Sequence, residues 1–435
     1  MKHYALIILI LALVASIGGF LLFRDAVPPA LELKPDSGPV SAARPLSLIL
    51  TDDDAGLKKV TISVTQEDRT IELPGTDFER GTATKTLPLS LAEAKLKDGP
   101  LTLQVKATDQ AVFANTAEQS FTLDYDSRPP VLSVLTTAHN LNQSGAGLVL
   151  YKVSEDVERS GVEVGELFFP GYPQDEGFYA CLFTFPFDMP QADFLPHLIA
   201  VDKAGNERKT GFYYHTNPRP PKRDVINLSQ QFLDSKMPEF QALFPESDNM
   251  LDLFLRVNRD LRVQNIASLK DLARMTASAP TWKGTFLRLP NAAPRAGFNE
   301  KRSYMYSGNK VDEQTHLGVD LASLANSPVP AANSGKVVFA DYLGIYGNCV
   351  VIDHGLGLQS VYGHLSTIDV AVGDQINRGQ TIGRTGATGM AGGDHLHFEV
   401  TIGGIPANPL EWWDPTWIKN NFTDKWQAAL KPPAK

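Results

Sequence analysis

The chain has 435 residues, of which 43% are hydrophobic and 20% charged, and its formal net charge at pH 7 is −9. This composition is that of ordinary globular protein, and the length indicates about three domains. The acidic balance argues against a nucleic-acid partner and against a polybasic attachment to anionic lipid.

The chain starts with an unbroken apolar run, Tyr4–Phe23. At about 1.5 Å per residue, a helix of this length spans roughly 30 Å, the thickness of a bilayer core. Residues 1–26 are therefore predicted to be a single-pass anchor in the inner membrane, with the rest of the chain on the extracytoplasmic, periplasmic side. A cleaved signal peptide is the rival interpretation, although its apolar region is usually shorter and ALVA at 12–15 is a poor cleavage site.

Residues 27–221 are expected to be β-structure, because apolar and polar residues alternate along them. Leu101, Leu103 and Val105, for example, alternate with threonine, glutamine and lysine. This period of two gives strands with one buried face. The two cysteines of the chain, Cys181 and Cys349, lie in strand-like surroundings of different predicted domains. Buried free thiols are expected, although an exported chain could oxidise them.

The same region contains an internal repeat of about 91 residues, near the size of one β-sandwich module. The repeat consists of two matched pairs: SFTLDYDSRPP (120–130) with GFYYHTNPRPP (211–221), and ATDQA (107–111) with AVDKA (200–204). The pattern resembles the immunoglobulin-like modules found in tandem on bacterial surface proteins. We expect one module at 27–130 and one at 131–221, serving as spacers or as binders of other envelope proteins.

Residues 222–280 have a different pattern, in which Met250, Phe254, Val257 and Leu261 recur at three- and four-residue spacing. This spacing is typical of amphipathic helices. The segment is predicted to be a helical connector, and its position just before the last domain suggests that it covers the site described next.

Histidines cluster in the last third of the chain, where five of the nine fall between residues 316 and 397. His316 and Asp320 share a face at i and i+4, and His395 and His397 share a face of a strand at i and i+2. His364 lies between these two pairs in VYGHLS. Neutral imidazole and carboxylate are ordinary ligands of a divalent cation, so the cluster predicts a metal site, of zinc or of non-haem iron.

Residues 281–414 resemble the lysostaphin-type (LytM-domain) zinc metallopeptidases, which cut peptide bonds in peptidoglycan. The resemblance is carried by HLGVDLA at 316–322, VYGHL at 361–365, HLHFEV at 395–400 and the surrounding VVIDHG, VGDQINRGQTIGRTGATG and PANPLEWW. It implies an antiparallel-β domain in which His316, Asp320 and His397 bind Zn²⁺, while His364 and His395 form the catalytic pair. The run Gly297–Arg302 departs from the Phe-Gly that often precedes the family's arginine.

The sequence thus predicts a mainly β protein: anchor, two β-sandwich modules, helical connector, metallopeptidase domain and a C-terminal tail at 415–435. The expected function is that of a membrane-anchored zinc endopeptidase that cuts peptide cross-links of peptidoglycan. The alternative is a non-enzymatic activator of cell-wall amidases, since some members of the resembled family have lost ligands and act in that way.

Overall fold

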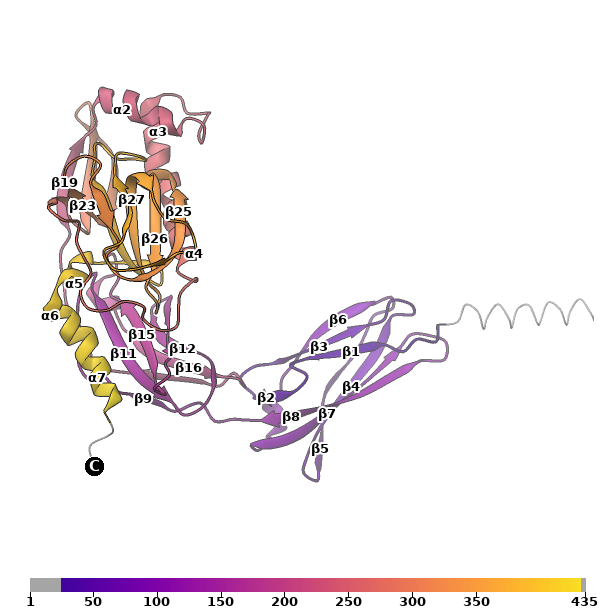
Figure 1. The fold of residues 1–435 in the computed structure, drawn as a ribbon. Helices are drawn as coiled ribbons and strands as arrows, with labels where there is room; N and C mark the ends of the chain where they lie inside the picture. Colours follow the sequence, from indigo (N-terminus) through magenta and orange to yellow (C-terminus); the bar gives the residue numbers. More distant parts are fainter. Residues whose placement is uncertain (1–24, 432–435) are drawn as a thin grey trace, which may run out of the picture. The chain divides into compact units, whose positions relative to one another are not determined.

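The computed structural model describes residues 25–431 (Figure 1). The predicted membrane helix Tyr4–Phe23 lies outside the described residues. Between residues 25 and 431, no helix is both long and apolar enough to cross a membrane. The described chain divides into two compact units. The first comprises 25–130 with 155–158 and 201–208, and the second comprises 131–154, 159–200 and the chain from 209 onward.

The first unit has a three-stranded sheet of order β1-β3-β6 and a five-stranded sheet of order β2-β8-β7-β4-β5. The alternation predicted for Leu101, Leu103 and Val105 is confirmed, because all three are buried in β7. Buried side chains of both sheets form one core, as in a β-sandwich. An immunoglobulin-like topology stays a prediction. The strands are β1 Ala30–Lys34, β2 Gly38–Val40, β3 Leu46–Thr51, β4 Leu57–Gln66, β5 Arg69–Asp77, β6 Thr84–Leu89, β7 Gly99–Asp109 and β8 Thr116–Tyr125.

The next ten strands, at 132–217, also pair mainly in antiparallel fashion, in sheets of order β14-β15-β11-β9, β13-β12-β16-β17 and β10-β18. Cys181 in β15 and Cys349 in the C-terminal sheet are both buried and free, as predicted. The strands are β9 Leu132–Val134, β10 Asn140–Asn142, β11 Ala146–Val153, β12 Val157–Val164, β13 Leu167–Pro170, β14 Tyr172–Pro173, β15 Tyr179–Thr184, β16 His197–Asp202, β17 Glu207–Gly211 and β18 His215–Asn217.

The predicted connector begins as a strand. β19, Lys222–Asn227, pairs in parallel with β21 of the C-terminal domain. Helices follow, and Phe254, Val257 and Leu261 face the interior as their spacing predicts. Ser229 and Asn249 cap the first and second α-helices by accepting hydrogen bonds from backbone N–H groups. The helices are α2 Gln230–Lys236, α3 Met250–Arg256, a π-helical turn Val257–Leu261 and α4 Arg262–Leu272.

The predicted antiparallel-β domain is present. Its central sheet has the order β20-β23-β30-β27-β26-β25-β28, and β21 and β22 pair beside it with β19. Residues 415–430, expected to be a tail, are helical. The elements are β20 Ala293–Ala296, β21 Glu300–Tyr306, β22 Asn309–His316, β23 Val319–Ala322, β24 Pro328–Pro330, β25 Gly335–Tyr342, β26 Asn348–Asp353, β27 Leu358–Ile368, β28 Gln375–Ile376, β29 Thr381–Thr385, β30 Leu396–Ile402, β31 Ile405–Ala407, α5 Pro409–Trp413, α6 Pro415–Ile418 and α7 Asp424–Leu430.

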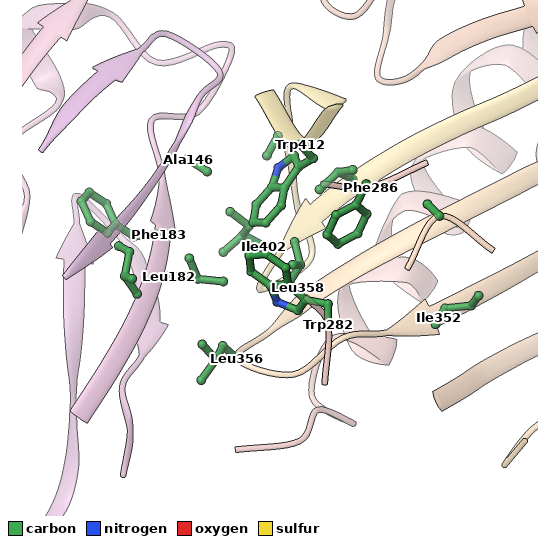
Figure 2. Packing of buried hydrophobic residues seen from close by; sticks show 14 of the residues in the cluster. Ala146, Leu182, Phe183, Trp282, Phe286, Ile352, Leu356, Leu358, Ile402 and Trp412 are labelled. Carbon is green, nitrogen blue, oxygen red and sulfur yellow. The ribbon is translucent and has the colours of Figure 1, made fainter. Parts of the chain in front are cut away.

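One hydrophobic core joins the strands at 132–217 to the C-terminal sheet (Figure 2). Leu182 and Phe183 of β15 belong to the same buried cluster as Trp282, Ile402 and Trp412. The buried carboxylate of Glu411 adds a polar connection, since it accepts hydrogen bonds from the Asn142 side chain and the Ala146 N–H. The second predicted module and the predicted metallopeptidase domain therefore share one hydrophobic core.

Candidate metal centre

Strand pairing brings the predicted ligands together. His316 is the last residue of β22, and Asp320 lies four residues later in β23. Antiparallel pairing of β23 with β30 places Asp320 directly opposite His397. Backbone register alone thus unites two motifs that lie 77 residues apart.

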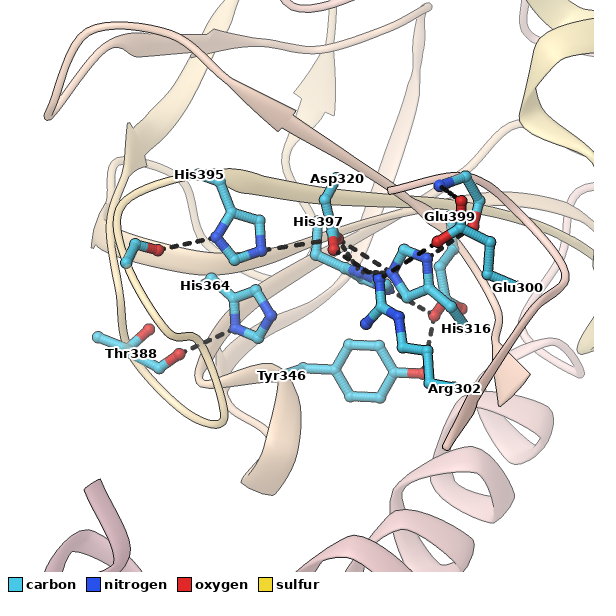
Figure 3. Close-up of polar contacts among 12 residues, drawn as sticks. Glu300, Arg302, His316, Asp320, Tyr346, His364, Thr388, His395, His397 and Glu399 are labelled. Atoms are coloured by element: carbon cyan, nitrogen blue, oxygen red, sulfur yellow. Dashed lines mark hydrogen bonds and ion pairs between the residues drawn. The ribbon is translucent and has the colours of Figure 1, made fainter. Parts of the chain in front are cut away.

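One possible ligand atom from each of His316, Asp320 and His397 converges at this point (Figure 3). His316 Nε2 lies 3.0 Å from Asp320 Oδ1 and 3.0 Å from His397 Nδ1, and His397 Nδ1 lies 2.9 Å from Asp320 Oδ1. Ligand atoms around a tetrahedral zinc ion are separated by roughly 3.3 Å, because each bond to zinc is about 2.0–2.1 Å long. The two nitrogens and one oxygen therefore fit Zn²⁺ and leave a fourth coordination position for water.

The outer nitrogen of each ligand imidazole has a hydrogen-bond acceptor. His316 Nδ1–H donates to the Gly297 carbonyl over 2.8 Å, and His397 Nε2–H donates to Glu399 Oε1 over 2.7 Å. Glu399 also accepts a hydrogen bond from the Tyr346 hydroxyl at 2.9 Å. Such partners fix the tautomer and the ring orientation of metal-ligating histidines. They leave His316 Nε2 and His397 Nδ1 facing the cation.

His364 and His395 lie side by side next to this triad, with ring centroids 4.9 Å apart (Figure 3). Their Nδ1–H groups donate to the carbonyls of Thr388 and Gly393, so each ring keeps Nε2 for the cleft. His395 Nε2 lies 3.6 Å from Asp320 Oδ1. His364 has a φ of 63°, an uncommon backbone conformation for a residue other than glycine, and such strain clusters at functional sites.

A partly buried arginine holds the second oxygen of the Asp320 carboxylate. Arg302 of β21 donates from its guanidinium to Asp320 Oδ2 over 3.1 Å. Glu300 lies 3.9 Å from the same guanidinium. The carboxylate is therefore oriented from both sides, with Oδ2 on Arg302 and Oδ1 toward the two ligand histidines.

Burial and neighbouring charges shift the pKa values of the site residues in opposite directions. Burial lowers the pKa of His316 and holds that of His364 well below the usual range, so both rings are neutral at pH 7. Burial opposes ionisation of Asp320, but His316 and hydrogen bonds from the histidines hold its pKa well below the ordinary value. Burial also opposes charging of His397, yet bonds to Asp320 and Glu399 raise its pKa to about 9.

The five side chains open into a cleft with a volume of about 320 Å³. The predicted connector contributes to the wall of this cleft, since Leu228, Phe232 and Phe254 line it together with the histidines. The connector thus lines the cleft, as expected of a segment that covers the site. Whether the connector restrains activity at the site stays a prediction.

The fifth histidine between residues 316 and 397, His354, lies apart from the site and forms hydrogen bonds with the Ser334 carbonyl and the Ser360 hydroxyl. The motifs that identify the ligands do not identify Arg302 or Tyr346, because the roles of these two residues depend on contacts between distant segments. The position of Glu399 near the site follows from strand geometry, since it lies two residues after His397 on the same face of β30.

Comparison with known families agrees with this geometry. The description "Peptidase family M23" matches residues 314–409, which include all five predicted site residues. Residues 314–409 form a peptidase family M23 domain. The predicted resemblance to LytM-type peptidases is thereby confirmed for this part of the chain.

Several curated proteins match the region of the M23 domain. The chain is 41% identical over 95 residues to the DD-carboxypeptidase/endopeptidase Mpg of Neisseria meningitidis, covering 22% of each chain. It is 37% identical over 116 residues to the peptidoglycan DD-endopeptidase ShyB of Vibrio cholerae, covering 27% of this chain and 26% of the relative. It is also 37% identical over 109 residues to the murein hydrolase activator EnvC of Escherichia coli, covering 25% and 26%. The matches thus span about a quarter of each relative's length.

Proposed function

We propose that this protein is a zinc-dependent endopeptidase that cuts peptide cross-links of peptidoglycan. The main support for this proposal is that His316, Asp320 and His397 converge on one point within a cleft. The pair His364 and His395 lies beside them in the same cleft. The relatives named as peptidoglycan DD-endopeptidases support the substrate class.

Each side chain has a role that follows from its contacts. His316, Asp320 and His397 would hold Zn²⁺, which supplies polarisation of the scissile carbonyl and activation of a water molecule. His364 is neutral at pH 7, and its Nε2 is available to accept a proton from the attacking water. As the C–N bond breaks, the proton taken up by His364 would pass to the leaving amine, while His395, with Nε2 also directed to the cleft, would orient the attacking water.

The activator function is the second candidate, because the murein hydrolase activator EnvC is among the relatives. The presence of every ligand and of both further histidines favours the enzyme. An activator would need neither three convergent ligand atoms nor two further imidazoles with their Nε2 atoms directed to the cleft.

We also propose that the protein acts outside the cytoplasm, with Tyr4–Phe23 holding it in the inner membrane. The length and apolar character of that run support this location. Protease added to intact spheroplasts should then degrade the M23 domain. Protection of the domain until the membrane is lysed would contradict the location.

The function is tested with residues 27–435, purified peptidoglycan, and mass spectrometry of the products with and without Zn²⁺. We expect zinc-dependent loss of cross-linked dimers, and the masses of the products name the bond. His397→Ala controls for contaminating hydrolases. Unchanged peptidoglycan from a zinc-loaded protein that increases the rate of a purified wall amidase would favour the activator.

A further inference from the structure

Three aspartates of the first unit gather far along the chain from the M23 domain. Asp25 precedes β1, Asp52 directly follows β3, and Asp109 is the last residue of β7. One carboxylate oxygen from each lies within 4.8 Å of the other two. Asp52 is 6% exposed and Asp109 is fully buried.

Two carboxylate oxygens in this cluster are buried without a donor. Asp52 Oδ1 accepts the N–H groups of Ala55 and Gly56, which leaves Oδ2 for the cluster. That Oδ2 atom is buried and has no hydrogen-bond partner, and Asp25 Oδ2 is in the same condition. Buried carboxylate oxygens without partners are costly, so each indicates a ligand that completes it.

In the part of the chain that the structure describes, none of the three aspartates forms an ion pair with lysine or arginine. Three negative charges at such distances repel one another strongly in a buried setting. A cation in their midst would remove the repulsion and supply a partner for both orphaned oxygens.

A similar arrangement recurs in the same unit. Asp126, Glu155 and Asp202 also offer carboxylate oxygens within 4.8 Å of one another. Their places correspond to those of the first cluster. Asp126 precedes the second predicted module, Glu155 follows strand β11, and Asp202 is the last residue of β16. This second cluster has no orphaned oxygen and carries no proposal, but it shows that the first arrangement is built twice by the repeat.

An asparagine organises both clusters in the same manner. Asn115 Nδ2 donates to the Asp25 carbonyl over 3.3 Å and to Asp109 Oδ2 over 2.7 Å. In the second cluster, Asn206 makes the same two bonds to a carbonyl and a carboxylate, each 2.9 Å long. The carboxylates are thus held in place by neutral donors rather than neutralised.

We propose that Asp25, Asp52 and Asp109 bind a divalent cation of the Ca²⁺ type. All the available ligand atoms are oxygens, which suit hard cations rather than zinc. Ca²⁺ accepts irregular sets of six to eight oxygens, whereas Mg²⁺ requires a near-ideal octahedron and gives up its waters reluctantly. Bound Ca²⁺ would fix the chain at Asp25 to two strand ends of the sandwich. This proposal does not depend on the peptidase function.

The test uses the full chain in mild detergent, with the M23 site first filled with Zn²⁺ so that it does not take up the added cation. CaCl₂ is titrated by calorimetry, and thermal unfolding is followed with and without Ca²⁺. We expect binding by the wild type and a rise in the midpoint of the first unit of roughly 10 °C at a hundredfold excess over Kd. Asp52→Asn and Asp25→Asn should each lose one binding event.

For both variants, the change in stability relative to the wild type should reverse its sign when Ca²⁺ is added, which misfolding cannot produce. Without Ca²⁺ each should be at least as stable as the wild type, because one repelling charge is gone. With Ca²⁺ each should be less stable than the wild type. Asp68→Asn, an equal change of charge at an exposed turn, should behave as the wild type does. No Ca²⁺ binding by the wild type, or unchanged binding by both cluster variants, would overturn the proposal.

Discussion

Each histidine of the metal centre is oriented by a hydrogen bond on its far side. One N–H group of each imidazole donates a hydrogen bond to an oxygen of Gly297, Glu399, Thr388 or Gly393. The other nitrogen of each ring, which faces the site, is thereby left for a cation or for substrate. At the scale of the residue, the site is thus defined as much by these acceptors as by the ligands.

Removal of a ligand should abolish zinc binding. Replacing His316, Asp320 or His397 with alanine removes one of three protein ligands. We expect a loss of affinity beyond the roughly 100-fold that the loss of an outer hydrogen-bond partner can cost. Zinc titration against a competing chelator measures this. An alanine variant that keeps the wild-type Kd would refute the ligand assignment.

Glu399→Gln should weaken zinc binding by about tenfold, because a neutral amide no longer makes His397 a more basic ligand. The change is isosteric, so the buried side chain keeps its packing. Glu313→Gln, at an exposed position in β22, is the matched control and should leave Kd unchanged. Equal Kd values for both variants would show that Glu399 does not support the ligand.

Zinc affinity should rise with pH up to about 9. Because the pKa of His397 is raised to about 9, this ring carries two protons at pH 7 before a cation binds. Zinc must displace the Nδ1 proton, so affinity should fall by about tenfold per pH unit below 9. Calorimetry in buffers of different ionisation enthalpy should report release of about one proton at pH 7. Binding without proton release would contradict the assignment.

At the scale of the element, the strand pair β23 and β30 delivers both motifs to one point, and Gly318 allows them to approach. A Cβ at position 318 would lie 2.7 Å from the Phe398 carbonyl and 2.8 Å from His397 Cε1. No larger residue fits between His316 and Asp320 without moving a ligand.

Gly318→Ala should therefore lower stability by about 1–3 kcal/mol and weaken zinc binding at the same time. Thermal unfolding and zinc titration measure the two effects. Gly211→Ala is the control, because a Cβ there meets no atom within 4 Å. If Gly318→Ala binds zinc as the wild type does, the close packing of the two strands is not required for the site.

The sequence predicts local features of these elements well and tertiary contacts poorly. Spacing of two and four correctly groups His316 with Asp320 and His395 with His397. The structure differs in detail, because His316 ends β22 while Asp320 lies in β23, and His395 directly precedes β30. Arg302 and Tyr346 could not be found in this way, because each reaches the site from a different strand or turn. β19 was missed for a similar reason: its pairing with β21 depends on a partner more than seventy residues away.

At the scale of the whole molecule, one hydrophobic core runs from the strands at 132–217 into the C-terminal sheet, so these parts of the second unit pack together. Trp412 packs against Trp282, Phe286 and Trp417 within the shared core. Sequence patterns show which faces are apolar but not which faces meet, so the shared core could not be predicted. Cutting the chain near residue 280 would expose this core.

Trp412→Ala should destabilise the second unit by about 3–5 kcal/mol, because it removes a fully buried indole from that core. Scanning calorimetry should show one transition for residues 131–430 that shifts downward, while a separate transition of the first unit stays in place. Separate transitions for the strands at 132–217 and for the M23 domain would contradict the shared core.

The most direct test of the peptidase itself compares the zinc-loaded wild type with His364→Ala on cross-linked muropeptide dimers. His364 is not a zinc ligand in this arrangement, so the variant should keep its metal while cleavage falls by about 100-fold or more. Conversion of dimers to monomers by the wild type, and its loss in a variant with equal zinc content, is the predicted result. No conversion by the zinc-loaded wild type, or equal rates for both proteins, would contradict it.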